Sequence, residues 1–400
     1  MKSLSILTDA APAFDRPIPV GQLYFPSWER YEAAMRGIFE REYYNNNGPL
    51  LSELEAQLRV FFGTKHAICV GNATFGLMMV AEALGLKGRV ILPSFTYISS
   101  AVSVAWSGAK PLFCDVEPDT HQIDPNRIED LLAHNSDISA IMAVNLWGDA
   151  ADIPALQDLS DRYDVPLFFD SAHAAGCAFG ARPIGGFGRA EVFSFHATKA
   201  LGAAEGGCIT TDGDALAARL RGIRPSYGSE PSSEPYRVIN SRMSEAQAAI
   251  ALMNLDDFEA IRARNKRLFT AYAEGLSGIE GLRVLHPTRV SKSNYQYAVC
   301  DVNAERFGVS RDLLMAALQA ENVQARRYFY PGIHRSAEFG TDPNPATPPL
   351  PVTETLCAEC LQLPLGAKTD EDTVELICAL IAEVQRRSAE LGQDQRCSVG

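Results

Sequence analysis

Residues 67–92 read AICVGNATFGLMMVAEALGLKGRVIL, and this stretch decides the fold expected for the 400-residue chain. The apolar runs Ala67–Val70 and Arg89–Leu92 predict two short strands. Between them, Asn72–Leu84 has helical spacing, and Gly85 just past its end is a typical helix stop. A helix that joins two strands in this way is the repeating unit of a parallel sheet.

The same alternation of strands and helices continues to residue 170. Further strands are expected at 110–115, 140–145 and 166–170, and further helices at 99–107, 127–133 and 153–163. This period predicts an α/β fold with a large, mostly parallel sheet that helices cover on both faces. Ligands of such sheets bind at the carboxyl ends of the strands, so functional side chains are expected there.

Outside this alternation, the pattern predicts an arm at the start and a second, smaller domain at the end. Helices are expected at 29–41, 51–62, 311–321 and 370–386, strands at 282–285, 295–302 and 323–326, and a loop with five prolines at 343–351. Residues 244–273 are expected to be long and helical and to connect the two domains. The predicted division is an N-terminal arm over 1–20, a large domain over 21–255, a small C-terminal α/β domain over 256–390 and a frayed tail over 391–400.

Composition excludes several classes of protein. The net charge is -13, and no Lys/Arg run supplies the basic face that a nucleic-acid binder needs. No apolar run approaches membrane-spanning length, and the start lacks the pattern of a secretory signal. Together with nine cysteines, an odd number, this predicts a cytoplasmic protein with no nucleic-acid or membrane partner. Cys357 and Cys360 have no second ligand pair nearby, so they are expected to be two small residues one helical turn apart, and no metal site is predicted.

The first candidate catalytic residue lies in the motif Phe193-Ser194-Phe195-His196-Ala197-Thr198-Lys199, which Glu205-Gly206-Gly207 follows. Lys199 comes after an apolar, strand-like stretch and before small, glycine-rich residues. A lysine in a confined, partly apolar site has a lowered amine pKa and can attack a carbonyl group. The alternative is a lysine at a buried edge that pairs with Glu205.

The second candidate is Asp170, at the end of the apolar strand expected at 166–170. Pyridoxal phosphate (PLP) chemistry needs a lysine that forms a Schiff base and a carboxylate that keeps the pyridine nitrogen protonated. Lys199 and Asp170 are one such pair of residues. The alternative for Asp170 is a helix N-cap, and His173, three residues further on, is either part of the same site or a structural histidine.

A third group of residues suits the phosphate and the ring of this cofactor. Gly71-Asn72-Ala73-Thr74 follows a strand and opens a helix, where free backbone N–H groups and a hydroxyl form an anion site. Ser194 offers another hydroxyl, and Tyr97, after the next strand, offers an aromatic ring that can stack. A plain capping turn at 71–74 and core packing of Tyr97 are the alternatives.

Taken together, these motifs resemble the sugar aminotransferases of the DegT/DnrJ/StrS family, a branch of the aspartate-aminotransferase-like PLP enzymes. The resemblance runs from Asn47-Gly48-Pro49 to about residue 385. Its most specific blocks are the lysine motif with E-G-G, D-x-A-H-A at 170–174 and A-R-R-Y-F-Y-P at 325–331. It implies the PLP-dependent transferase fold, with a large sheet domain and a smaller C-terminal α/β domain.

The resemblance also implies roles for individual residues. Lys199 would be the Schiff-base lysine and proton shuttle, Asp170 the pyridinium partner, His173 a ring contact and Tyr97 the stacking aromatic. Phosphate contacts would come from Ala73, Thr74 and Ser194. Asn240 resembles the asparagine that reaches the cofactor phosphate of a neighbouring subunit, so a homodimer with shared sites is implied. Arg242, Arg326 and Arg327 could meet substrate anions, although solvated surface charge is the alternative for each.

Among family members, the chain is most similar to those that aminate C4 of nucleotide-linked 4-keto-6-deoxyhexoses, with glutamate as the expected donor. The enzymes that form dTDP-4-amino-4,6-dideoxyglucose are of this kind. The chain departs from many relatives at Asn145-Leu146-Trp147-Gly148, where they have His-x-Tyr-Gly, and at Ala200 and Ala204. A cyclitol or another ring ketone is therefore the alternative acceptor. A sugar dehydratase would have His in place of Lys199, and a non-catalytic regulator would carry a DNA-binding segment or a degraded site.

Overall fold

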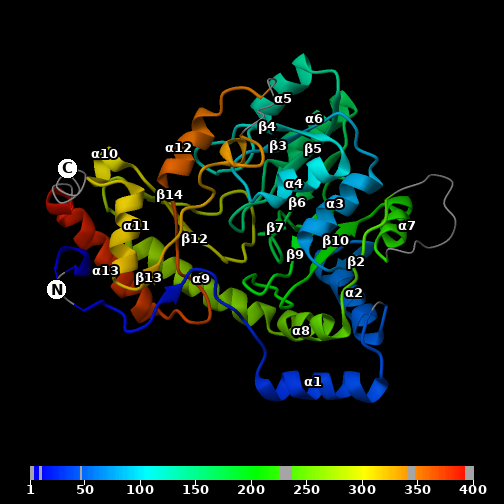
Figure 1. The fold of residues 1–400 in the computed structure, drawn as a ribbon, viewed down its shortest axis with the longest axis horizontal. Coiled ribbons are helices and arrows are strands. Elements are labelled where there is room, and N and C mark those ends of the chain that lie inside the picture. Colours follow the sequence, from blue (N-terminus) through cyan, green and yellow to red (C-terminus); the bar gives the residue numbers. More distant parts are fainter. Residues whose placement is uncertain (1–3, 9–10, 46, 226–236, 341–346, 392–400) are drawn as a thin grey trace.

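The computed structural model describes the chain except for residues 1–3, 9–10, 46, 226–236, 341–346 and 392–400, so the tail predicted at 391–400 lies almost wholly outside the described residues. Figure 1 shows a large unit around a central sheet and a smaller unit that contains the end of the chain. None of the helices in the described part combines the length and apolarity needed to cross a bilayer.

The central sheet has seven strands in the order β2-β10-β9-β6-β5-β3-β4. Their bounds are β2 His66–Val70, β3 Arg89–Pro93, β4 Lys110–Cys114, β5 Ile138–Val144, β6 Leu167–Asp170, β9 Glu191–Ser194 and β10 Gly207–Thr211. Only β10 runs antiparallel to its neighbours, so the other six strands point the same way. The prediction of a mostly parallel α/β sheet is confirmed.

Helices cover both faces of this sheet because side chains alternate along each strand. In β2, Ile68 and Val70 pack on one face, while Ala67 and Cys69 pack on the other. The first face is covered by α3 Ala73–Ala83, α4 Ser99–Ser107 and α7 Asp214–Ile223. The second is covered by α2 Pro49–Phe62, α5 Pro125–His134, α6 Ile153–Tyr163 and α8 Glu245–Asp256. Burial on both sides explains why the strands read as continuous apolar runs rather than alternating ones.

The smaller unit is built on a three-stranded antiparallel sheet in the order β11-β12-β14. Its elements are β11 Leu282–Val284, β12 Ala298–Val302, β14 Cys360–Leu363, α9 Phe258–Gly275, α10 Ala304–Phe307, α11 Arg311–Ala320 and α13 Glu371–Arg386. The start of the chain packs here too, because Leu4 is buried in this core and β1 Ile18–Pro19 pairs in parallel with β13 Val323–Gln324. The remaining helices are α1 Trp28–Arg41, which contacts α8 (Figure 1), and α12 Pro351–Glu359.

Three of the predicted elements differ in the structure. Residues 244–273 form two helices rather than one, and these meet at Asp257, whose carboxylate also binds Arg30 of α1. The strand expected at 295–302 begins only at Ala298, since the preceding residues leave the small sheet and bond to the large unit. Pro351, predicted to lie in a loop, is the first residue of α12, a position where proline's fixed φ and missing N–H are tolerated.

The Cys357–Cys360 pair also differs from the expectation. Cys357 lies in α12, but Cys360 is the first residue of β14 rather than part of the same helical turn. Both thiols are buried and free.

One buried acid inside the large unit makes stability depend on pH. Glu191, on β9, is fully buried and accepts hydrogen bonds from the Ser171 hydroxyl and from the N–H groups of Gly185 and Phe187. Burial is the largest influence and raises the pKa of Glu191 from 4.5 to about 7, although these hydrogen bonds oppose it. Between pH 4.5 and about pH 7, Glu191 therefore keeps its proton in the folded protein but loses it in the unfolded chain.

We predict that Glu191→Gln, which mimics the protonated acid, removes part of the pH dependence of stability. Wild-type stability should fall, relative to the variant, by about 3 kcal/mol as pH rises through this window, because ionisation of Glu191 is penalised only in the fold. Urea unfolding at pH 5 and pH 8 measures the difference. Equal changes in both proteins would contradict the prediction.

Candidate functional site

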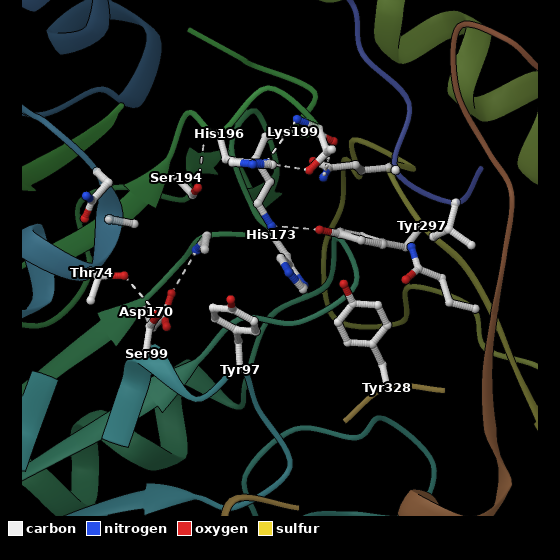
Figure 2. Close-up of a pocket in the computed structure, with 18 of the residues that line it drawn as sticks. Thr74, Tyr97, Ser99, Asp170, His173, Ser194, His196, Lys199, Tyr297 and Tyr328 are labelled. Carbon is white, nitrogen blue, oxygen red and sulfur yellow. Dashed lines mark hydrogen bonds between the residues drawn. The ribbon is translucent and has the colours of Figure 1, made fainter. Parts of the chain in front are cut away.

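A cavity of about 750 Å³ opens beside the carboxyl ends of the strands and is lined by both units. It brings together most of the predicted site residues, although they come from segments far apart in the sequence (Figure 2). Those that line it are Ala73, Thr74, Tyr97, Asp170, His173, Ser194, Lys199 and Arg326. Asn240, Arg242 and Arg327 are not among its lining residues.

Lys199 extends into this cavity from the loop after β9. Its Nζ donates a hydrogen bond to the hydroxyl of Tyr297 at 2.9 Å (Figure 2). Burial lowers the pKa of the Lys199 amine from 10.5 to about 8, while the charge of Asp170 opposes this shift. Near neutral pH the amine therefore has access to both its charged and its neutral form, as a nucleophile or proton carrier requires.

Asp170 is the last residue of β6 and is almost fully buried. Its carboxylate accepts hydrogen bonds from the Ser100 hydroxyl at 2.8 Å and from the Ala172 N–H at 3.2 Å. Burial raises the pKa of Asp170, and these two hydrogen bonds and the charge of Lys199 oppose the shift. A buried carboxylate at this position is suited to face a cation inside the cavity.

His173 lies between these charged groups and a set of aromatic rings. The pKa of His173 lies well below its ordinary value, so the ring is neutral. Burial is the main cause, and the charge of the nearby Lys199 adds to it. Its Nδ1 is buried and has no hydrogen-bond partner among the described residues. The ring centroid lies 4.3 Å from that of Tyr297 and 5.4 Å from that of Trp147. An unpaired buried nitrogen at a cavity wall indicates a polar ligand atom.

The start of α3 provides an anion cradle. The Asn72 side chain caps the helix by accepting from the Phe75 N–H, and the Thr74 hydroxyl donates to the Ser99 hydroxyl at 2.9 Å. The N–H groups of the first helical residues have no partner within the helix, which favours a bound anion. Gly207 lets β10 approach closely, because a Cβ there would lie 2.9 Å from the backbone nitrogen of Ala73.

The predicted residues outside the cavity have other partners within the chain. The exposed Asn240 accepts a hydrogen bond from Nε of Arg242 at 2.9 Å. Arg327 lies 3.4 Å from the Asp312 carboxylate, and its guanidinium lies over the Tyr330 ring. Arg326, by contrast, lines the cavity, and its backbone pairs with that of Gln362.

Four aromatic lining residues were not anticipated from the sequence: Tyr24, Tyr297, Tyr328 and Phe329. Tyr297 fell within the strand expected at 295–302, and no local pattern indicates that it meets Lys199, 98 positions away. Phe329 stacks on Trp147 with ring centroids 5.3 Å apart. Two serines were also not anticipated: Ser100, which bonds to Asp170, and Ser99, which bonds to Thr74. Both lie in a stretch whose pattern indicates only the helix expected at 99–107.

Trp147 is itself held by a buried network that joins the two units. Its Nε1 donates to Nδ1 of His121 at 3.3 Å, and Nε2 of His121 bonds to the Asp301 carboxylate at 3.1 Å. The same carboxylate accepts from Arg283 at 2.8 Å. His121, Asp301 and Cys360 have ligand-type atoms within 4.8 Å of one another, but hydrogen bonds and the Arg283 cation already engage the first two. The group is thus a hydrogen-bonded network, and it holds Trp147 beside the His173 ring.

Comparison with known proteins agrees with this geometry. Residues 28–382 match the model of the DegT/DnrJ/EryC1/StrS aminotransferase family. The chain is 30% identical over 372 residues to a dTDP-4-amino-4,6-dideoxy-D-glucose transaminase from Shigella dysenteriae, covering 93% of this chain and 100% of that protein. It is 26% identical over 370 residues to the transaminase of the same name from Escherichia coli, covering 92% and 98%.

A solved structure is similar over almost the whole chain. It is the crystal structure of DesI in the presence of its TDP-sugar product, with 37% sequence identity and a TM-score of 0.93. The match covers 98% of this chain and 99% of DesI.

We predict that Ser100→Ala weakens PLP binding by about ten-fold or more, because a hydrogen bond to a charged carboxylate is lost. Without this donor the pKa of Asp170 should rise further, which leaves less charge to hold the cofactor ring. Ser103→Ala is the matched control, since the Ser103 hydroxyl lies on the same helix but donates to the Ser100 carbonyl. Titration of the cofactor-free protein with PLP measures both, and equal affinities would refute the role of Ser100.

Proposed function

The chain belongs to the DegT/DnrJ/EryC1/StrS aminotransferase family, and we propose that this PLP-dependent aminotransferase moves an amino group from L-glutamate to C4 of a nucleotide-linked 4-keto-6-deoxyhexose. The observation that carries the proposal is the Lys199 amine of lowered pKa in one cavity with the buried Asp170. The relatives from Shigella dysenteriae and Escherichia coli and the similarity to DesI support the acceptor class.

The residues of the cavity fit PLP. The buried Nδ1 of His173 has no hydrogen-bond partner in the part of the chain that the structure describes. The carboxylate of Asp170 suits a pyridinium, and the start of α3 suits a phosphate. Ala73, Thr74 and Ser194 would hold that phosphate, while Tyr97 would lie against the ring. When bound, PLP supplies an electron sink that stabilises negative charge on the α-carbon of the amino acid.

The protein's own residues then have separate tasks. Lys199 is the covalent attachment point and carries a proton at Nζ, because a pKa of about 8 allows the amine to accept and release it near neutral pH. The hydrogen bonds from Ser100 and Ala172 favour the charged form of Asp170, which would orient the cofactor. His173 and the aromatic rings beside it exclude water from that face of the site.

Arg326 is the proposed contact for the anionic part of a substrate. Arg326 is the arginine found among the described residues that line the cavity. Glutamate brings carboxylates and a nucleotide sugar brings a diphosphate, and either forms strong charge-assisted hydrogen bonds with arginine. The chain has a net charge of -13, so this attraction must be local.

A homodimer is proposed because Asn240 lies outside the cavity of its own chain, where it could serve a second copy. Exposed aromatic side chains lie on and beside α1, which leaves apolar surface for such a contact; they are Phe25, Trp28, Phe39, Tyr43 and Tyr44. Sedimentation velocity at micromolar concentration should give the mass of two chains. A monomer at every concentration would contradict the proposal.

The function is tested by incubating the purified holoenzyme with glutamate and a panel of nucleotide-linked 3-keto and 4-keto sugars, with products identified by mass spectrometry and NMR. We expect amination at C4 and ping-pong kinetics, because two half-reactions use one site. Lys199→Ala and Lys199→Arg should abolish turnover and the visible absorbance of the lysine-linked cofactor. A panel without an aminated sugar would instead favour a cyclitol or another ring ketone as acceptor.

The same assay tests Arg326. Arg326→Gln should raise KM for one substrate by about ten-fold or more, since a charge-assisted hydrogen bond to a substrate anion is lost. Arg327→Gln removes the same charge one residue away, outside the cavity lining, and should change KM less.

A further inference from the structure

The segment before β12 carries a tyrosine from the small unit into the site of the large unit. Asn294 fixes this segment by donating from Nδ2 to the carbonyls of His173 at 2.9 Å and Ala175 at 3.0 Å. Gln296 accepts a hydrogen bond from the Ala200 N–H at 2.9 Å, directly after Lys199. The residues around Tyr297 are therefore bonded to two loops of the large unit. One is the loop that follows Asp170, and the other is the loop that carries Lys199.

The ring of Tyr297 is held so that its hydroxyl meets the Lys199 amine. Its ring centroid lies 4.3 Å from that of His173 and 5.4 Å from that of Trp147, which contacts it edge-on. The hydroxyl oxygen accepts from Nζ of Lys199 at 2.9 Å, and Figure 2 shows Tyr297 reaching this amine from the side opposite Asp170 and Thr74. Rigid packing on two rings leaves the hydroxyl little freedom to point elsewhere.

We propose that Tyr297 is the positioning residue for the Lys199 amine: its hydroxyl holds the amine inside the cavity whenever that amine is not bonded to the cofactor. The proposal goes beyond the family's lysine and aspartate, and only its kinetic consequence rests on the proposed function. It assigns a task to a residue of the small unit in the chemistry of the large unit.

A phenol hydroxyl suits both protonation states of the amine. Its oxygen accepts from an ammonium group, and its proton can be donated to a neutral amine, so the contact survives proton transfer. Burial keeps the pKa of Tyr297 well above its ordinary value, so the phenol itself stays neutral. The hydroxyl therefore guides the amine without competing for its proton.

The loss of this hydroxyl should change the amine in a defined direction. An acceptor for the ammonium form stabilises that form, so its removal should lower the pKa of Lys199 relative to the wild-type protein. The other titratable groups that line the same cavity come from several elements and stay in place: Tyr24, Tyr97, Asp170, His173, His196, Glu205, Arg326 and Tyr328.

The first test uses the full-length protein freed of cofactor and needs no substrate. Competitive acetylation with acetic anhydride, quantified by peptide mass spectrometry across pH, gives the titration midpoint of Lys199. Tyr297→Phe, which keeps the ring, should lower this midpoint by about one pH unit. Tyr328→Phe removes a hydroxyl of the same cavity that is not the partner of the Lys199 amine and should leave the midpoint within experimental error.

The second test uses the holoenzyme. Tyr297→Phe should lower kcat by about ten-fold while KM changes by less than about two-fold, because a freed amine that is poorly placed slows proton transfer and not substrate binding. Thermal unfolding of the two variants checks that the fold is intact.

An unchanged Lys199 midpoint in Tyr297→Phe would overturn the inference even if the wild-type enzyme aminates a sugar. A shifted midpoint in an enzyme that aminates none of the sugars would leave Tyr297 in its role and refute the proposed acceptor instead. The two failures are thus distinguishable.

Discussion

The structure depends on one carboxylate, Asp170, that is buried at the end of a central strand and lines the cavity. Asp170 ends a strand whose two faces are both covered by helices, so burial opposes its charge and only hydrogen bonds and a cation can restore it. Ser100 supplies a hydrogen bond from α4, and Lys199 supplies the nearby positive charge from the loop after β9. The same burial that raises the pKa of Asp170 lowers that of Lys199, which makes the amine reactive.

The small unit takes part in this site and does not merely cover it. Its chain enters the large unit at Asn294, Gln296 and Tyr297, and its Asp301 holds His121 and, through it, Trp147. A change in the relative position of the units would therefore move groups that touch Lys199 and His173.

Much of the fold could be predicted because it is written in local periodicity. The alternation that begins at Ala67 gave the helices at 99–107 and 153–163 with the bounds that the structure has. Two predictions were wrong near contacts with distant residues. The expected helix is interrupted at Asp257, which binds Arg30, and the residues before Ala298 leave their sheet to reach another unit. Local patterns cannot register such contacts, because the partners lie tens to hundreds of positions away.

The sequence by itself predicted which groups would carry chemistry: an acid at a strand end, a lysine after an apolar strand and a helix start suited to phosphate. Each follows from its immediate neighbours, since strand ends and helix starts are local features. Only the tertiary structure decided that Arg326 lines the cavity while Arg327 pairs with Asp312, and that Tyr297 meets Lys199. These outcomes depend on side-chain direction and on burial by other segments, which become definite only when the two units pack against each other.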